Sequence, residues 1–198
     1  MDKISVLIPT YNREEFLGQA LNSLRAQTFA NWEAIVVDNG CSSTAQNVAM
    51  GLKDERIKYL KASHNLGECG ARNLAFAHSS GNYVCYLDDD DILPEHSLES
   101  RLHFYTMHAN CGMVYGEYRT FRVDPSECHD VNLSSSIAYC RKNYYDRLLT
   151  RVRYGQKETF YLLKFFNFVR GGTPLIKRST LEDVGLFDES FRVAGSET

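Results

Sequence analysis

Residues 4–27, "ISVLIPTYNREEFLGQALNSLRAQ", join a predicted buried strand to a predicted amphipathic helix. Residues 4–8 are apolar except for Ser5, and the run ends at Pro9, which is typical of a strand that is buried on both faces. Residues 13–27 then repeat apolar side chains at helical spacing, namely Phe16, Leu17, Ala20, Leu21 and Leu24. A strand followed by a helix that covers it is therefore the first unit of the predicted fold.

The same alternation continues to about residue 91. Further strands are predicted at residues 32–37, 57–62 and 83–87, and further helices at residues 45–52 and within 65–81, where Gly81 stops the helix. Beyond them, the pattern predicts a helix at 94–109, a long strand at 112–123, and a short strand, a helix and a turn within 173–191. The expected fold class is α/β, with a mostly parallel central sheet flanked by helices.

Composition narrows the class of protein. The 198 residues suit one domain, and the formal net charge of −3 argues against a nucleic-acid partner. No secretory signal is recognisable, and no apolar stretch approaches the roughly 20 residues of a membrane span. The six cysteines form no C-x-x-C pair, so we interpret them as reduced thiols and expect a cytoplasmic protein.

Polar clusters follow three of the predicted strands. "PTYN" begins at Pro9, "DNG" begins at Asp38, and "DDDD" occupies residues 88–91. In open parallel sheets, ligands bind beyond the carboxyl ends of the strands. We therefore expect the three clusters to meet at one edge of the sheet.

The four consecutive carboxylates of "DDDD" need an explanation, because like charges repel each other unless water or a cation screens them. In an extended chain, Asp88 and Asp90 would point to the same side and could hold one cation. Their hard oxygen ligands favour Mg²⁺ or Mn²⁺. The alternative is a solvated acidic turn that caps the helix expected from Pro94.

Five blocks of the sequence occur together and in a familiar order: "SVLIPTYNREEFLGQALNSLRAQTF", "WEAIVVDNG", "NLGECGARNLAF", "GNYVCYLDDDD" and "LEDVGLFDESF". In these blocks the chain resembles the N-terminal catalytic domain of family 2 glycosyltransferases, closely from Ile4 to about Asp91 and thinly after that. The resemblance implies a GT-A fold, a Rossmann-like sandwich. It also implies one domain, with residues 1–91 as the nucleotide-sugar-binding half and residues 92–198 as the acceptor-side half.

The resemblance assigns roles to individual residues. The set that it implies for nucleotide-sugar binding is Pro9, Thr10, Tyr11, Asp38, Asn39, Arg72, Asp88 and Asp89. Asp88 and Asp90 would form the D-x-D pair that holds the divalent cation, Mn²⁺ or Mg²⁺. Asn39 stands where the family often has a second aspartate, which leaves the base preference open. Plainer alternatives are an Asx turn at Asp38 and an ordinary helix-surface ion pair at Arg72.

The implied reaction is an inverting transfer of a sugar from a nucleotide-diphosphate sugar, with a UDP-sugar favoured, to an acceptor hydroxyl. The acceptor would be a glycan or a lipid-linked molecule, in polysaccharide or cell-surface glycan synthesis. The family's general base follows the G-x-F-D-E-x-F block, and Glu197 is the carboxylate in that neighbourhood. Because the family continues with a further helix, we expect the chain to be truncated.

Two other functions remain open at this point. One is a catalytically incomplete domain that binds a nucleotide sugar without turning it over. The other is a nucleotidyltransferase, although the stretch between Pro9 and Phe16 lacks the glycines of a phosphate-binding loop.

Residues 141–170 combine eight Lys or Arg with two Asp or Glu, and eight aromatic residues are interspersed among them. This bias is consistent with peripheral contact with the inner face of a membrane, or with an acceptor-side element. The alternative is a packed helix pair whose outer face carries solvated Lys and Arg.

Overall fold

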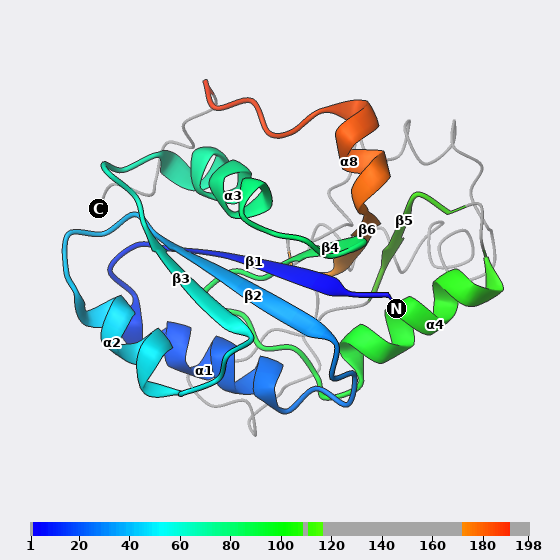
Figure 1. Cartoon of the computed structure of the whole chain (residues 1–198), viewed down its shortest axis with the longest axis horizontal. Coiled ribbons are helices and arrows are strands. Elements are labelled where there is room, and N and C mark those ends of the chain that lie inside the picture. Colours follow the sequence, from blue (N-terminus) through cyan, green and yellow to red (C-terminus); the bar gives the residue numbers. More distant parts are fainter. Residues whose placement is uncertain (1, 109–110, 117–171, 191–198) are drawn as a thin grey trace, which may run out of the picture. The chain divides into compact units, whose positions relative to one another are not determined.

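The computed structural model describes residues 2–108, 111–116 and 172–190. They belong to one compact unit, formed by residues 1–116 and 171–198, that contains a six-stranded sheet in the order β3-β2-β1-β4-β6-β5 (Figure 1). The strands are β1 (Ile4–Thr10), β2 (Trp32–Asp38), β3 (Ile57–Lys61), β4 (Tyr83–Tyr86), β5 (Met113–Tyr115) and β6 (Pro174–Lys177). Strands β1 to β4 pair in parallel, and β6 runs antiparallel to both β4 and β5. The predicted α/β class with a mostly parallel sheet is confirmed.

Helices cover both faces of the sheet. They are α1 (Glu14–Arg25), α2 (Thr44–Gly51), α3 (Gly67–Ala77), α4 (Ser97–Met107) and α8 (Arg178–Val184). In Figure 1, α1 and α2 lie on one side of the sheet, and α3 lies on the other. Successive β1 residues alternate between the two layers, because Val6 and Ile8 belong to the core cluster with α1, whereas Leu7 belongs to the cluster with α3.

Helix α1 follows its predicted pattern with one exception. Leu17, Ala20, Leu21 and Leu24 are fully buried against the sheet, as the helical spacing predicts. Phe16 is 48% exposed instead, because it lies at the edge of the apolar stripe. Glu14 and Glu15 occupy the first turn, where negative charge stabilises the helix dipole.

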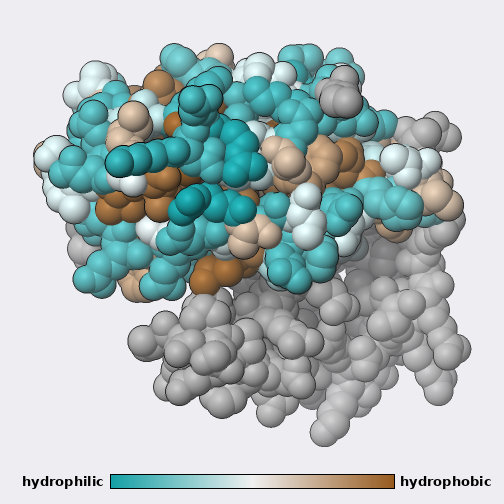
Figure 2. Space-filling view, turned by 60° about the horizontal axis from the view of Figure 1, so that its bottom comes forward, coloured by the Kyte–Doolittle hydropathy of each residue, from teal (hydrophilic) through white to brown (hydrophobic). Residues whose placement is uncertain are grey.

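The side of the unit seen in Figure 2 is mostly hydrophilic, with hydrophobic residues between polar ones.

Three elements have a boundary that differs from the prediction by more than two residues. Helix α4 begins at Ser97 rather than Pro94, since residues 94–97 form a turn closed by the Ser97 N–H on the Pro94 carbonyl at 2.9 Å. Helix α3 ends at Ala77, so Gly81 does not stop it. Gly81 is needed for close packing, because a Cβ there would lie 2.7 Å from the Lys3 carbonyl oxygen. Of the strand predicted at 112–123, residues 113–115 are a strand, and residues 117–123 lie outside the described residues.

A buried carboxylate joins the amino ends of β1, β2 and β3. Glu33 accepts hydrogen bonds from the Ser5 hydroxyl at 2.8 Å and the Ser80 N–H at 2.6 Å. Lys58 and Lys3 approach its other oxygen at 2.8 and 3.0 Å. Burial alone would raise the pKa of Glu33, but these donors outweigh it and hold that pKa well below its usual range. This network lies at the end of the sheet opposite the three polar clusters.

Candidate active site

The three polar clusters meet at the carboxyl edge of the sheet, as the strand pattern predicts. Thr10 at the end of β1 is the register partner of Asp38 at the end of β2, and the Asn39 N–H donates to the Thr10 carbonyl at 2.9 Å. On the other side of β1, the Thr10 hydroxyl donates to Asp89 Oδ2 at 2.7 Å. Strand β1 thus lies between the "DNG" turn and the acidic run.

The acidic run is a turn, so the assumption of an extended chain from Asp88 to Asp90 is wrong. The Asp91 N–H donates to the Asp88 carbonyl at 3.0 Å and closes the turn. The nearest partner differs among the first three carboxylates. Asp88 pairs with Arg72 at 2.6 Å, Asp89 turns inward to Thr10, and Asp90 pairs with Arg13 at 2.8 Å. Two arginines therefore reduce the repulsion within the run.

Asp89 is the buried member of the run, with 7% of its side chain exposed. Desolvation by burial raises its pKa, although the Thr10 hydroxyl, Arg13 and the Tyr11 backbone N–H act in the opposite direction. Its contacts connect the β4 end to the loop after β1. The contacts observed for Asp89 are all with other residues of the described part of the protein. Its expected role in nucleotide-sugar binding stays a prediction.

Arg72 of α3 is held by charges and by aromatic rings. Its guanidinium contacts Asp88 Oδ1 and Glu68 Oε1, both at 2.6 Å. Its central carbon lies 5.5 Å from the Tyr86 ring centroid and 5.4 Å from that of Phe187, within the range of cation–π attraction. Arg72 is thus largely enclosed beside the acidic run, and an ordinary helix-surface ion pair does not describe it.

Tyr86 completes this aromatic enclosure. Its ring meets Phe187 edge to face, with centroids 5.3 Å apart. Burial raises the pKa of Tyr86 to about 12, with Arg72 acting in the opposite direction, so its phenol is neutral at physiological pH. Asp88 and Glu68 both contact the same nitrogen of the Arg72 guanidinium, Nη2.

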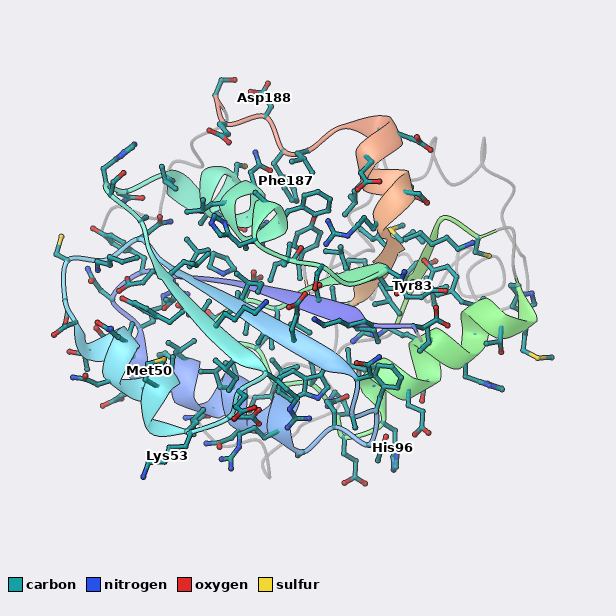
Figure 3. The ribbon with its side chains drawn as sticks, in the orientation of Figure 1. Met50, Lys53, Tyr83, His96, Phe187 and Asp188 are labelled. Carbon is teal, nitrogen blue, oxygen red and sulfur yellow. The ribbon has the colours of Figure 1, made fainter. Side chains whose placement is uncertain are left out.

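Asn73 fixes Phe187 against α3, which the sequence analysis did not anticipate. Its amide donates to the Phe187 carbonyl at 2.9 Å and to Glu189 Oε1 at 2.9 Å. In return, the Phe187 N–H donates to Asn73 Oδ1 at 3.1 Å. Figure 3 shows Phe187 beside α3. These hydrogen bonds hold the "GLFDES" block at the site. In the sequence, the one indication of this contact was that both segments belong to blocks shared with one family.

Asp38 is buried and organises the turn after β2. Its Oδ1 accepts the Gly40 N–H at 2.7 Å, which is the Asx turn considered from the sequence. Its Oδ2 accepts the Tyr59 hydroxyl at 2.7 Å and Lys61 Nζ at 2.8 Å. Burial, together with Asp38, raises the pKa of Tyr59. Tyr59 and Lys61 were absent from the predicted site, because nothing in the sequence pairs the ends of β2 and β3.

Asn39 uses both ends of its amide to hold the start of α3. Its Nδ2 donates to the Gly67 carbonyl at 3.0 Å, and its Oδ1 accepts the Leu66 N–H at 3.3 Å. An aspartate could make only the second of these contacts, since an ionised carboxylate has no donor. This explains why an amide suits position 39 in this chain.

The remaining predicted features divide into two groups. Pro9 is buried beside Val37 of β2, and Tyr11 is 37% exposed at the same edge. Glu197 and residues 141–170 lie outside the described residues, so their roles stay predictions. Cys41, Cys69, Cys85 and Cys111 are free thiols. In the part of the chain that the structure describes, no helix is long and apolar enough to cross a membrane.

The donor set at the acidic run is compatible with a divalent cation. Asp88 and Asp90 present carboxylates that are 34% and 48% exposed, and such hard oxygens suit Mg²⁺ or Mn²⁺. Within residues 2–108, 111–116 and 172–190, no group of three or more His, Cys, Asp or Glu side chains is arranged to hold a metal ion. A cation at Asp88 and Asp90 would therefore need further oxygens, such as those of a diphosphate or of water.

Known glycosyltransferases resemble this chain in sequence. Residues 5–185 match the family described as Glycosyl transferase family 2. A curated relative is UDP-Glc:alpha-D-GlcNAc-diphosphoundecaprenol beta-1,3-glucosyltransferase WfgD of Escherichia coli, which is 34% identical over 115 residues. That match covers 58% of this chain and 45% of WfgD, so the chain spans less than half of that relative.

Solved structures of glycosyltransferases share the fold. The structure of S. aureus TarS matches with a TM-score of 0.68 and 22% identity over 97% of this chain and 31% of TarS. TarS 1–349 in complex with UDP-GlcNAc matches with a TM-score of 0.57 and 28% identity over 62% of this chain and 36% of that protein. The family match covers most of the chain, and the fold is the GT-A fold of these neighbours. The chain therefore belongs to glycosyl transferase family 2.

Proposed function

We propose that this chain carries the donor-binding part of an inverting glycosyltransferase that moves a sugar from a UDP-sugar to a hydroxyl group of a lipid-linked glycan. The observation that carries the proposal is the meeting of Arg72 and Asp88 at the carboxyl edge of a family 2 sheet. The guanidinium of Arg72 and the partly exposed carboxylate of Asp88 lie where parallel sheets bind ligands. The acceptor and the pathway are those of cell-surface glycan synthesis.

Relatives support the choice of donor. WfgD is named for UDP-Glc, and TarS 1–349 was solved with UDP-GlcNAc. In this chain, the nucleoside would lie against Pro9, Thr10 and Tyr11, next to the turn that Asp38 and Asn39 organise. Because the Asp38 carboxylate already accepts three hydrogen bonds, we propose that it acts on the base mainly by shaping this turn.

Asp88 and Asp90 are the residues that would hold a divalent cation, Mn²⁺ or Mg²⁺. A cation bound there would neutralise the negative charge that the diphosphate gains as it leaves. Arg72 would contribute a second, permanent positive charge to the same group, since a guanidinium stays protonated in proteins. Asp88 would then face both Arg72 and the donor.

The proposed step is a single displacement at the anomeric carbon. The acceptor oxygen forms a bond to that carbon while the bond from the carbon to the diphosphate oxygen breaks, which inverts the configuration. The acceptor hydroxyl loses its proton to a general base, and the electron pair of the broken bond leaves on the diphosphate. Glu197, in the segment after Ser190, is the candidate base.

The name of WfgD also supports a lipid-linked acceptor, because it describes a diphosphoundecaprenol substrate. We propose that residues 141–170 provide contact with the acceptor or with the inner face of the membrane. Pelleting with anionic and neutral vesicles at low salt tests the membrane part. Binding to neither would contradict it.

A turnover assay tests the proposed function. The chain is incubated with Mn²⁺, a panel of UDP-sugars and GDP-sugars, and a short-chain polyprenyl-diphosphate sugar, and product mass and released nucleotide are measured. We expect UDP release together with an acceptor heavier by one sugar. Nucleotide binding without product would instead support the catalytically incomplete domain. Diphosphate release in a parallel incubation with a nucleoside triphosphate and a sugar phosphate would support a nucleotidyltransferase.

A further inference from the structure

Arg13 lies at the acidic run, although no role follows for it from the sequence. It occupies the position just before α1, next to the end of β1. Its Nη1 lies 2.8 Å from Asp90 Oδ2 and 3.5 Å from Asp89 Oδ1. Asp90 is one of the two carboxylates assigned above to the divalent cation. One arginine thus occupies a carboxylate oxygen that the proposed site needs.

The two arginines at the run are held very differently. Arg72 is 11% exposed and is fixed by Asp88, Glu68 and the two aromatic rings. Arg13 is 54% exposed, and its guanidinium contacts Asp89 and Asp90 alone among the described residues. Such an exposed ion pair contributes little energy, so it breaks readily when a stronger partner arrives. Arg13 can therefore leave Asp90, whereas Arg72 is fixed beside Asp88.

We propose that Arg13 is a replaceable counter-ion, which holds Asp90 in the nucleotide-free protein and releases it when a divalent cation binds together with the nucleotide diphosphate. This inference rests on the proposed function, because it needs the cation site at Asp88 and Asp90. In the free protein, the positive charge of Arg13 repels a cation and competes with it for Asp90. When a diphosphate is present, its negative charge offers Arg13 an alternative partner.

The consequence is a coupling between the two ligands. A divalent cation alone binds weakly. The nucleotide raises the affinity of the protein for the cation by more than the contacts between phosphate and cation would account for. By thermodynamic linkage, the cation improves the affinity for the nucleotide by the same factor. Arg13 thus favours loading of the cation and the nucleotide as a pair.

The test measures Mn²⁺ affinity, and therefore does not depend on turnover. Free Mn²⁺ is titrated by electron paramagnetic resonance with the wild-type chain, with Arg13→Gln and with Arg25→Gln, each with and without UDP. Arg25→Gln is the matched control, because this substitution removes the same charge from the other end of α1. There, Asp54 is the partner of Arg25, at 3.8 Å. Urea midpoints of the three proteins confirm that each is folded.

We expect Arg13→Gln to bind Mn²⁺ without UDP about three- to tenfold more tightly than the wild type, as for the loss of one nearby exposed charge. Arg25→Gln should match the wild type. The factor by which UDP improves Mn²⁺ affinity should fall in Arg13→Gln alone.

Two results would overturn the inference. Equal Mn²⁺ affinities in all three proteins, with binding to the wild type, would show that Arg13 does not compete, and would leave the proposed function intact. Absence of Mn²⁺ binding to every protein, even with UDP, would remove the cation site itself and the inference with it.

Discussion

Asn73 and Phe187, which are 114 residues apart in the chain, form a reciprocal pair of hydrogen bonds. The Asn73 side chain donates to the Phe187 carbonyl at 2.9 Å and accepts the Phe187 N–H at 3.1 Å. Through this pair, the segment after α8 brings an aromatic ring to Arg72. Asn73 is not among the residues expected to bind the nucleotide sugar, but it thereby supports Arg72, which is one of them.

Replacing Asn73 should therefore affect both stability and binding. Asn73→Ala removes both hydrogen bonds to Phe187 and the one to Glu189, and it leaves two backbone groups of Phe187 to water, so we expect a loss of about 1–2 kcal/mol in the free energy of unfolding. UDP affinity should fall as well, because Phe187 no longer confines Arg72. Urea denaturation and calorimetry measure the two effects. Asn22→Ala is the control, since Asn22 is exposed on α1 and its side chain accepts a hydrogen bond from Arg25 at 3.3 Å. Unchanged UDP affinity in a folded Asn73→Ala protein would contradict the supporting role.

The amide at position 39 gives a second prediction. Asn39→Asp removes the donor to the Gly67 carbonyl and adds a negative charge beside buried Asp38. We expect a loss of about 1–3 kcal/mol in stability, the usual range for an unsatisfied buried polar group. Asn31→Asp is the matched control, because Asn31 is exposed and donates to the Asp2 carbonyl at 2.9 Å. If both variants unfold at the same urea concentration, the clasp between Asn39 and α3 is not a stabilising feature.

The lowered pKa of Glu33 leads to a prediction of how the stability of the protein depends on pH. Its pKa in the folded protein lies below its ordinary value of 4.5, so the folded state binds this proton less readily than the unfolded state does. The stabilisation by Glu33 is therefore present above pH 4.5 and is lost as the pH falls toward the folded pKa.

The measurement compares unfolding free energies between pH 3 and pH 7 for the wild type and Glu33→Gln. We expect the variant to be less stable at pH 7, because it leaves Lys3 and Lys58 without a carboxylate partner. The difference should shrink as the pH falls through this range. A difference that stays constant with pH would contradict the assignment.

Much of the fold could be predicted from the sequence, because its pattern is local. The mostly apolar run from Ile4 to Ile8 and the helical spacing after it are both visible within 24 residues, and the strand and the helix that they predict were both observed. The meeting of Thr10, Asp38 and Asp89 at one edge also followed, since parallel strands place their carboxyl ends together.

The partners of the site residues could not be predicted in the same way. Arg13 meets Asp90 across 77 positions, and Asn73 meets Phe187 across 114, and neither pairing leaves a periodic signal. The shape of the acidic run was left open, because four aspartates are equally compatible with an extended strand end and with a turn. The hydrogen bond from Asp91 to Asp88 decides for the turn.

The central claim is that the acidic run and Arg72 form a nucleotide-diphosphate site that depends on a divalent cation. Calorimetric titration of UDP, with GDP as comparison, into the wild type, Asp90→Ala and Asp183→Ala tests it most directly, with and without Mn²⁺. Asp183 is the control, as an exposed aspartate on α8. We predict that Mn²⁺ tightens UDP binding by about tenfold or more, or roughly 1.4 kcal/mol, in the wild type and Asp183→Ala but not in Asp90→Ala. UDP binding that is indifferent to Mn²⁺ in the wild type, or no binding of either nucleotide, would contradict the claim.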